Sequence, residues 1–146
     1  MISRLLLFLS LLLLTSELVS QTIPLSGMWR GNLTQNEGGY RTDYDFEIYF
    51  KAGTNELSGR TYVRTSGIYG EMSFSGQRFG AVYHLKELEL VYSRKPGELA
   101  WCYKTMQLRL VKRGNDWYLE GPWQGVSEYG ACIPGWIVLK RIVPQA

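Results

Sequence analysis

The chain has 146 residues, of which 45% are hydrophobic and 14% aromatic, so it is long enough for one domain with its own core. Its formal net charge is only +3 and its 16 Lys and Arg residues are scattered, which argues against a nucleic-acid partner. One His and two Cys do not make a familiar zinc site, and we expect no metal and no other cofactor.

The first twenty residues are typical of a secretory signal peptide. Arg4 supplies a short positive segment, residues 5–14 form an apolar run, and Val19 and Ser20 are the small residues of a cleavage site. The run is too short for the roughly 20 residues of a membrane span, and no later segment is apolar enough. The sequence therefore predicts a secreted or periplasmic protein, cleaved near Ser20, with no membrane span and a single domain at 21–146.

The rest of the chain alternates between apolar and polar residues in short segments divided by Gly, Asn, Asp and Pro. Short connections favour antiparallel neighbours, and closure into a ring removes exposed sheet edges. We therefore expect an all-β fold, an antiparallel eight-stranded up-and-down β-barrel, with a two-sheet β-sandwich as the alternative. The predicted strands are 28–35, 42–51, 56–65, 70–77, 81–92, 101–113, 116–124 and 135–143.

The second predicted strand alternates most cleanly, with Tyr44, Phe46, Ile48 and Phe50 on the core side. Its carboxylates fall on the opposite face, which we interpret as the solvent side of a half-buried strand rather than as an acid–base site. Four glycines also fall among core-facing residues, which is typical of bends or close backbone approach in a barrel. These are Gly31, Gly59, Gly76 and Gly121.

The fifth and sixth predicted strands each place charged residues where apolar ones are expected. In 81–92, Leu88, Leu90 and Tyr92 share a face, and His84 and Lys86 fall on the same parity. Either a bulge resets the register or that end of the strand reaches solvent. In 101–113, Cys102 and Lys104 share the parity of Met106, Leu108 and Leu110. His84, the single histidine, is more typical of a structural role than a catalytic one.

In an up-and-down barrel, alternate connections lie at opposite ends. One end receives the short connections, and the other receives 36–41, 66–69, 93–100 and 125–134. Because function tends to collect on longer loops held by a rigid scaffold, we take this long-loop rim as the candidate working face. It carries Tyr40, Arg41, Tyr69, Arg94, Lys95 and Tyr129.

The two cysteines, Cys102 and Cys132, both fall at the long-loop rim, and an exported chain favours a disulfide between them. One strand separates their strands, so we expect Cys132 to reach back from its loop. Closing a loop of about 31 residues stabilises the fold by roughly 3–4 kcal/mol in the chain-entropy model. Lys104 lies deeper, where Glu87 or Glu89 can pair with it. The functional alternative is that Lys104 receives an anionic ligand group.

The first mature strand contains GMWRG and the last contains IVLKR. Together with the strand count, these motifs resemble the calycin superfamily, which includes lipocalins, fatty-acid-binding proteins and avidins. By this resemblance, Trp29 and Arg141 are structural closure residues at the short-turn end, and a small apolar or amphipathic ligand binds in the mouth. The segments WCYK, LEGPWQG and CIPGWIVLKR also resemble exported bacterial proteins of unassigned function.

The first functional hypothesis is a secreted calycin-like barrel that binds a small hydrophobic or amphipathic molecule. Its candidate ligand-binding residues are Lys104, Tyr92, Trp123, Tyr40 and Tyr69. Inward aromatic residues can instead fill so small a barrel.

The alternative is a non-enzymatic interaction module with a filled core, which contacts a cell-envelope protein or a glycan. Its candidate platform residues are Tyr40, Tyr69, Trp101, Tyr129 and Trp136. We expect no enzyme, because the chain has no nucleophile elbow, no histidine pair and no phosphate-binding loop.

Overall fold

The computed structural model describes residues 25–52 and 56–146, so the predicted signal peptide lies outside the described residues. The described chain is all β, and it contains no helix with the length and apolarity of a membrane span. Each predicted strand begins and ends within three residues of the corresponding observed strand. In chain order, the strands are β1 (Gly27–Thr34), β2 (Asp43–Phe50), β3 (Leu57–Thr65), β4 (Ile68–Phe79), β5 (Val82–Arg94), β6 (Tyr103–Arg113), β7 (Asp116–Ser127), β8 (Gly130–Ala131) and β9 (Gly135–Arg141).

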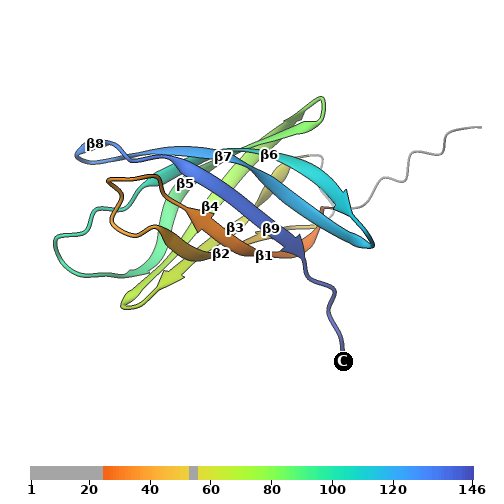
Figure 1. Cartoon of the computed structure of the whole chain (residues 1–146), viewed down its shortest axis with the longest axis horizontal. Helices are drawn as coiled ribbons and strands as arrows, with labels where there is room; N and C mark the ends of the chain where they lie inside the picture. Colours follow the sequence, from red (N-terminus) through yellow and green to blue (C-terminus); the bar gives the residue numbers. More distant parts are fainter. Residues whose placement is uncertain (1–24, 53–55) are drawn as a thin grey trace, which may run out of the picture.

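The strands form one closed antiparallel barrel (Figure 1). Neighbours follow the order β6-β5-β4-β3-β2-β1-β9-β7, and the pairing of β6 with β7 closes the ring. The two-residue β8 pairs antiparallel with the end of β7 and is not one of the strands of the ring. Closure confirms the predicted eight-stranded barrel and excludes the sandwich.

The two ends of the barrel differ as expected. In Figure 1, the tight turns at 80–81 and 114–115 lie at the right, and β8 lies at the left with the connections 35–42 and 95–102. The predicted loop 66–69 is a two-residue turn, because β4 begins at Ile68. Gly67 adopts a φ of 73° in this turn, a conformation that glycine reaches without strain.

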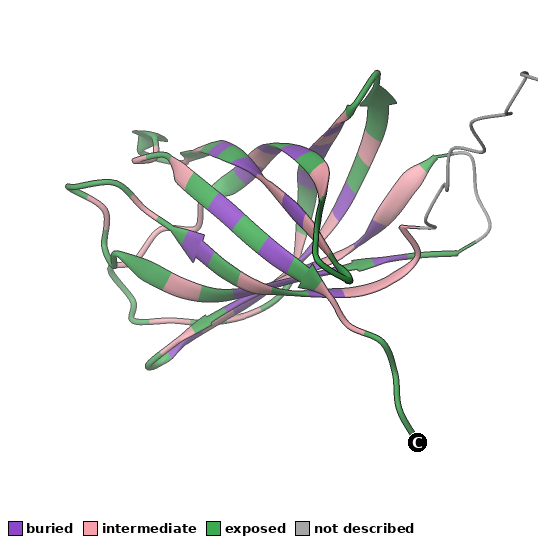
Figure 2. Cartoon of the chain, turned by 45° about the vertical axis from the view of Figure 1, so that its right-hand side comes forward, coloured by how far each residue is buried: buried purple, intermediate pink, exposed green. Residues whose placement is uncertain are grey.

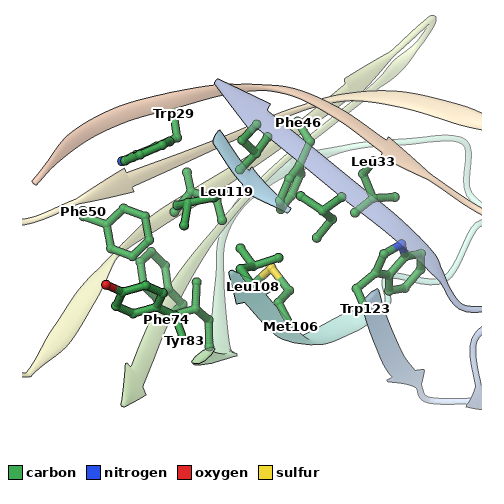
Figure 3. Packing of buried hydrophobic residues seen from close by; sticks show 14 of the residues in the cluster. Trp29, Leu33, Phe46, Phe50, Phe74, Tyr83, Met106, Leu108, Leu119 and Trp123 are labelled. Atoms are coloured by element: carbon green, nitrogen blue, oxygen red, sulfur yellow. The ribbon is translucent and has the colours of Figure 1, made fainter. Parts of the chain in front are cut away.

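The barrel interior is filled by side chains. Figure 3 shows the cluster running from Trp29 at one end to Trp123 at the other, with Leu119 and Leu108 between them. Strand β9 shows the underlying pattern, because buried and exposed residues alternate along it (Figure 2). The largest wholly buried aromatic side chains are Trp29, Phe46 and Phe50. The core therefore occupies the space that a large barrel would leave for a ligand.

The inward glycines mark places where neighbouring backbones approach closely. A Cβ on Gly59 would lie 1.7 Å from the carbonyl oxygen of Tyr49, and one on Gly121 would lie 1.9 Å from that of Gln107. Gly31 and Gly76 would also meet backbone oxygens of a neighbouring strand. Their absent side chains let the strands coil tightly enough to close a narrow barrel.

The first and last barrel strands meet as the sequence motifs predict. Trp29 of β1 lies opposite Arg141 of β9 in the register. The Trp29 indole is fully buried, and its N–H donates to the carbonyl oxygen of Leu25 at 2.9 Å. Leu25 precedes β1, so this bond holds the first described residue against the short-turn end.

Strand β5 departs from the predicted alternation. Leu88 and Tyr92 are exposed, whereas Tyr83 and Glu87 face the interior, so the expected apolar row was wrong. The reason is two irregularities in the β4–β5 ladder, which shift the register at Ser73/Phe74 and at Glu71/Met72. Of the two explanations that the sequence left open, the bulge is confirmed. Each extra residue moves the following side chains to the opposite face.

Candidate ligand site at the barrel mouth

A small cavity lies at the long-loop end, between the barrel wall and the connection 95–102. Its volume is about 90 Å³, and it is partly open to solvent. Most of its lining is apolar, and Lys104 is its single formally charged residue among those described. The lining comprises Leu33, Gln35, Tyr40, Tyr44, Val63, Ile68, Leu99, Ala100, Trp101, Cys102, Lys104 and Trp123.

The size of the cavity restricts what it can hold. It exceeds the roughly 10–15 Å³ that one water needs, but it is well below the roughly 300–1,000 Å³ of sites for drug-sized ligands. The filled interior below it, with Met106 and Phe46 wholly buried, prevents a long chain from entering. A few water molecules or a molecule of a few non-hydrogen atoms fit this space.

Lys104 is held by a buried polar network at the floor of the mouth. Its ammonium nitrogen lies 3.0 Å from Oε2 of Glu87, and it also donates to the carbonyl oxygen of Cys102 at 3.3 Å. The Thr61 hydroxyl donates to the other Glu87 oxygen at 2.5 Å. Both charged side chains are almost wholly buried, with 5% and 0% exposure for Lys104 and Glu87. Of the two expected partners, the structure selects Glu87.

Glu87 also marks the point where β5 and β6 separate. Their ladder runs only from Val82↔Arg109 to Lys86↔Thr105. One position further, the backbone N–H of Lys104 donates to Oε2 of Glu87 at 2.7 Å. The carboxylate thus replaces the next ladder acceptor and lets the strands diverge without leaving a buried N–H unpaired. This divergence opens the wall where the connection 95–102 enters the mouth.

Trp101 packs across the mouth above β4. Its ring lies where a side chain on Gly70 would be, because a Cβ there would come within 2.7 Å of the indole. The indole N–H of Trp101 is buried and has no acceptor among the described residues. Leaving a buried donor unpaired costs on the order of 1–3 kcal/mol.

The predicted disulfide is present and ties the segment between β8 and β9 to the connection 95–102. The predicted loop 125–134 is shorter than expected, because β7 continues to Ser127 and β8 occupies Gly130–Ala131. Cys102 and Cys132 are bonded, with their Cα atoms 6.2 Å apart. The N–H of Cys132 donates to Gly125 at 2.9 Å, and the Gln35 side chain donates to the Ile133 carbonyl at 3.1 Å. The bond is consistent with an oxidising extracellular or periplasmic location.

Tyr44 and Gln35 form the polar side of the cavity. The Tyr44 hydroxyl donates to Oε1 of Gln35 at 3.1 Å and accepts from the backbone N–H of Arg41 at 3.1 Å. Burial raises the pKa of the Tyr44 phenol, and the hydrogen bond from Arg41 partly opposes this rise. The phenol is therefore a neutral group at the mouth.

The predicted ligand-binding residues separate into two groups. Lys104, Trp123 and Tyr40 line the cavity. Tyr69 and Tyr92 lie outside it and pack against each other with tilted rings, whose centroids are 5.8 Å apart, and Tyr92 is 57% exposed.

Trp101 and Ala100 line the cavity, but the sequence did not place either in the ligand site. The available signal was Gly70, which shares the parity of the buried Ile68 and Met72 and so leaves room for a large side chain.

Compared with known proteins, the chain matches no protein-family model, and no curated protein or solved structure is significantly similar to it. Among the described residues, no group of three or more His, Cys, Asp or Glu side chains is arranged to hold a metal ion. The barrel itself is compatible with a calycin-like fold.

Proposed function

We propose that this protein is an exported, calycin-like binding protein that holds a small amphipathic molecule in the barrel mouth. The observation that carries the proposal is the cavity of about 90 Å³, in which apolar side chains surround the buried Lys104. An apolar concavity with a few convergent polar groups is the usual form of a small-molecule site. The GMWRG motif of β1 and the closed barrel support the likeness to calycins.

The ligand that best fits this mouth is short and uncharged. Glu87 already neutralises Lys104, so a carboxylate ligand would bring a second negative charge to a buried pair that is neutral overall. An ammonium has three N–H donors, and oxygen acceptors in the protein take two of those of Lys104. The third N–H can donate to a carbonyl or hydroxyl oxygen of the ligand.

Trp101 offers a second donor for such an oxygen. Its N–H is buried without an acceptor, so a modest rotation of the ring that exposes it to the ligand would recover a lost hydrogen bond. The apolar part of the ligand would then contact Leu33, Val63 and Ile68. A short amide or alcohol has this combination of one acceptor and a small apolar tail.

Calorimetric titration with butyramide and with butanoate tests the proposal. We expect butyramide to bind saturably at millimolar concentrations and butanoate to bind several-fold more weakly, because only the latter carries a charge. Binding of neither compound, or tighter binding of the anion, would contradict the proposed site.

A filling substitution supplies the matched control. Ala100 lines the cavity, so Ala100→Phe should occupy it and abolish butyramide binding. Ala81 is exposed in the turn between β4 and β5, at the opposite end, so Ala81→Phe should bind as the unaltered protein does. Equal binding of butyramide by the two variants would show that it does not bind in this cavity.

The filled core also favours a second candidate, a module that contacts a protein or glycan through its rim. Tyr40 and Tyr129 are 52% and 82% exposed there, which suits side chains that pack against a partner. A pull-down from cell-envelope extract with the Tyr40→Ser/Tyr129→Ser variant as reference tests this. If this second function is correct, the unaltered protein captures a partner that the variant does not capture. Capture of the same partners by both proteins would contradict it.

A further inference from the structure

The outer wall of the barrel has two halves that differ in their ion pairs. On β1 to β4, three ion pairs link neighbouring strands. Glu47 binds Arg30 at 2.7 Å and lies 3.8 Å from Arg64, and Arg60 lies 3.6 Å from Glu71. On β4 to β7, Arg113 pairs with Glu120 beside the short turn between β6 and β7. The rest of this second half includes polar side chains that form no such pairs.

Polar side chains on this second half form two adjacent rows across the strands. The first row is Lys86, Thr105 and Gln124, which are successive partners in the register of β5, β6 and β7. The second row is Gln77, His84 and Gln107, which are successive partners on β4, β5 and β6. We call these six residues the polar wall. Neighbouring strands place members of a row about 4.8 Å apart.

Within the described chain, no side chain of the polar wall makes a hydrogen bond or an ion pair. Its single ring contact is the edge-on packing of His84 against Phe79, with centroids 5.1 Å apart. Four of the six side chains are exposed, and Thr105 and His84 are half-buried. The polar wall thus carries a dense set of donors and acceptors that the protein does not use on itself.

The same region is hollowed. Three surface hollows adjoin one another here, and Thr105 lines all of them. Gln124 and Pro134 line the two nearer the long-loop rim. Exposed rings flank the rows, with Phe79 58% exposed on one side and Tyr103 37% exposed on the other. Unpaired polar groups therefore lie in a shallow, aromatic-flanked depression.

The composition of the polar wall indicates a neutral polyhydroxylated ligand. Carboxamides and hydroxyls both donate and accept, as sugar hydroxyls do, and exposed aromatic rings pack against apolar ring faces. The six residues include no carboxylate and one amine, Lys86, and Glu56 lines one of the three hollows beside them. One cation and one carboxylate leave the site without a strong charge, whereas a nucleic-acid strand needs several cations for its phosphates.

We propose that the polar wall on β4 to β7 is a binding site for a linear neutral oligosaccharide that lies across the strands. The site is on the outside of the barrel, so it does not depend on a ligand in the mouth. Small barrels are known to bind oligosaccharides on a strand face, which makes the arrangement physically reasonable.

Titration of isotopically labelled protein with cellopentaose, maltopentaose and tetra-N-acetylchitotetraose, followed by amide chemical shifts, tests this site. We expect at least one of these sugars to shift the amides of Lys86, Thr105 and Gln124 saturably at millimolar concentrations. If none of the three shifts these amides, or if shifts appear only at mouth residues such as Ile68 and Leu99, the proposal is overturned.

Two matched substitutions complete the test. Gln124→Ala removes an exposed carboxamide from the polar wall, and we expect the affinity to fall on the order of tenfold. Asn32→Ala removes a carboxamide from the paired half, where it donates to Asp43 at 2.9 Å, and should leave the affinity unchanged. Equal losses in the two variants would show that the effect is not local, and the proposal would fail.

Discussion

Lys104 and Glu87 form the central interaction at the scale of single residues. Replacing Lys104 with Met leaves a wholly buried carboxylate without its cation. We expect this change to lower the free energy of unfolding by about 3–5 kcal/mol, because a buried charge that loses its partner keeps its desolvation cost. Urea unfolding of the two proteins measures the difference.

Thr61→Val is the comparison for that substitution. It keeps the ion pair and removes one hydrogen bond to Glu87, which corresponds to roughly 1.5–3 kcal/mol. If Lys104→Met costs no more than Thr61→Val, the ammonium does not stabilise the carboxylate as described.

Tyr44 gives a prediction for alkaline pH. Burial raises its pKa above the ordinary value of 10.0, so the folded protein holds this proton more firmly than the unfolded chain. Its contribution to stability is therefore complete below pH 10 and decreases as the pH rises through the folded-state pKa. Tyr44→Phe should show a smaller loss of stability above pH 10 than the unaltered protein, measured by urea unfolding across that range. An identical pH dependence would contradict this.

At the scale of elements, glycine determines how closely strands approach. Gly121→Ala would place a Cβ 1.9 Å from the Gln107 carbonyl oxygen, so β6 and β7 must move apart. We expect a loss of about 1–3 kcal/mol or more, since overpacked sites shift backbone. Gly97→Ala, with no atom within 4 Å of the new Cβ, is the control. Similar melting temperatures for the two variants would refute the close-approach explanation.

The disulfide connects Cys132, between β8 and β9, to Cys102 at the end of the connection 95–102, and its removal has a predictable cost. Cys102→Ala/Cys132→Ala should lose roughly 3–4 kcal/mol, the chain-entropy value for a loop of this length. Thermal unfolding with and without reductant measures this, because only the unaltered protein should respond to reductant. A double variant as stable as the oxidised protein would mean that other contacts hold the segment between β8 and β9.

Strand β5 shows why sequence alternation failed in one place. Periodicity located β5 correctly, because most of its residues still alternate. A bulge changes parity without any fixed residue signature, so the expected apolar row included Leu88 and Tyr92, which are exposed, and left out Glu87, which lies inside. The sequence therefore limited the partner of Lys104 to Glu87 or Glu89, but it could not decide between these two residues.

For the whole molecule, the sequence was sufficient to predict the barrel, the difference between its two ends and the disulfide. The barrel and its unlike ends follow from local alternation and connection length, and the disulfide follows from two cysteines in an exported chain. The size of the cavity did not follow, because it depends on how Trp101 packs over Gly70 from a loop without periodicity. The sequence also could not show whether the barrel interior is empty or filled, because this depends on the barrel diameter. In the structure, the interior is filled by side chains that include Trp29, Phe46 and Phe50.

Amide chemical shifts during a butyramide titration test the central claim, which is that the barrel interior is filled and that a small amphipathic molecule binds at the mouth. We predict saturable shifts at Ile68, Leu99 and Lys104, with Leu119 and Leu139 in the interior unchanged. Shifts that extend to the interior residues, or binding of a long-chain apolar dye inside the barrel, would contradict the account.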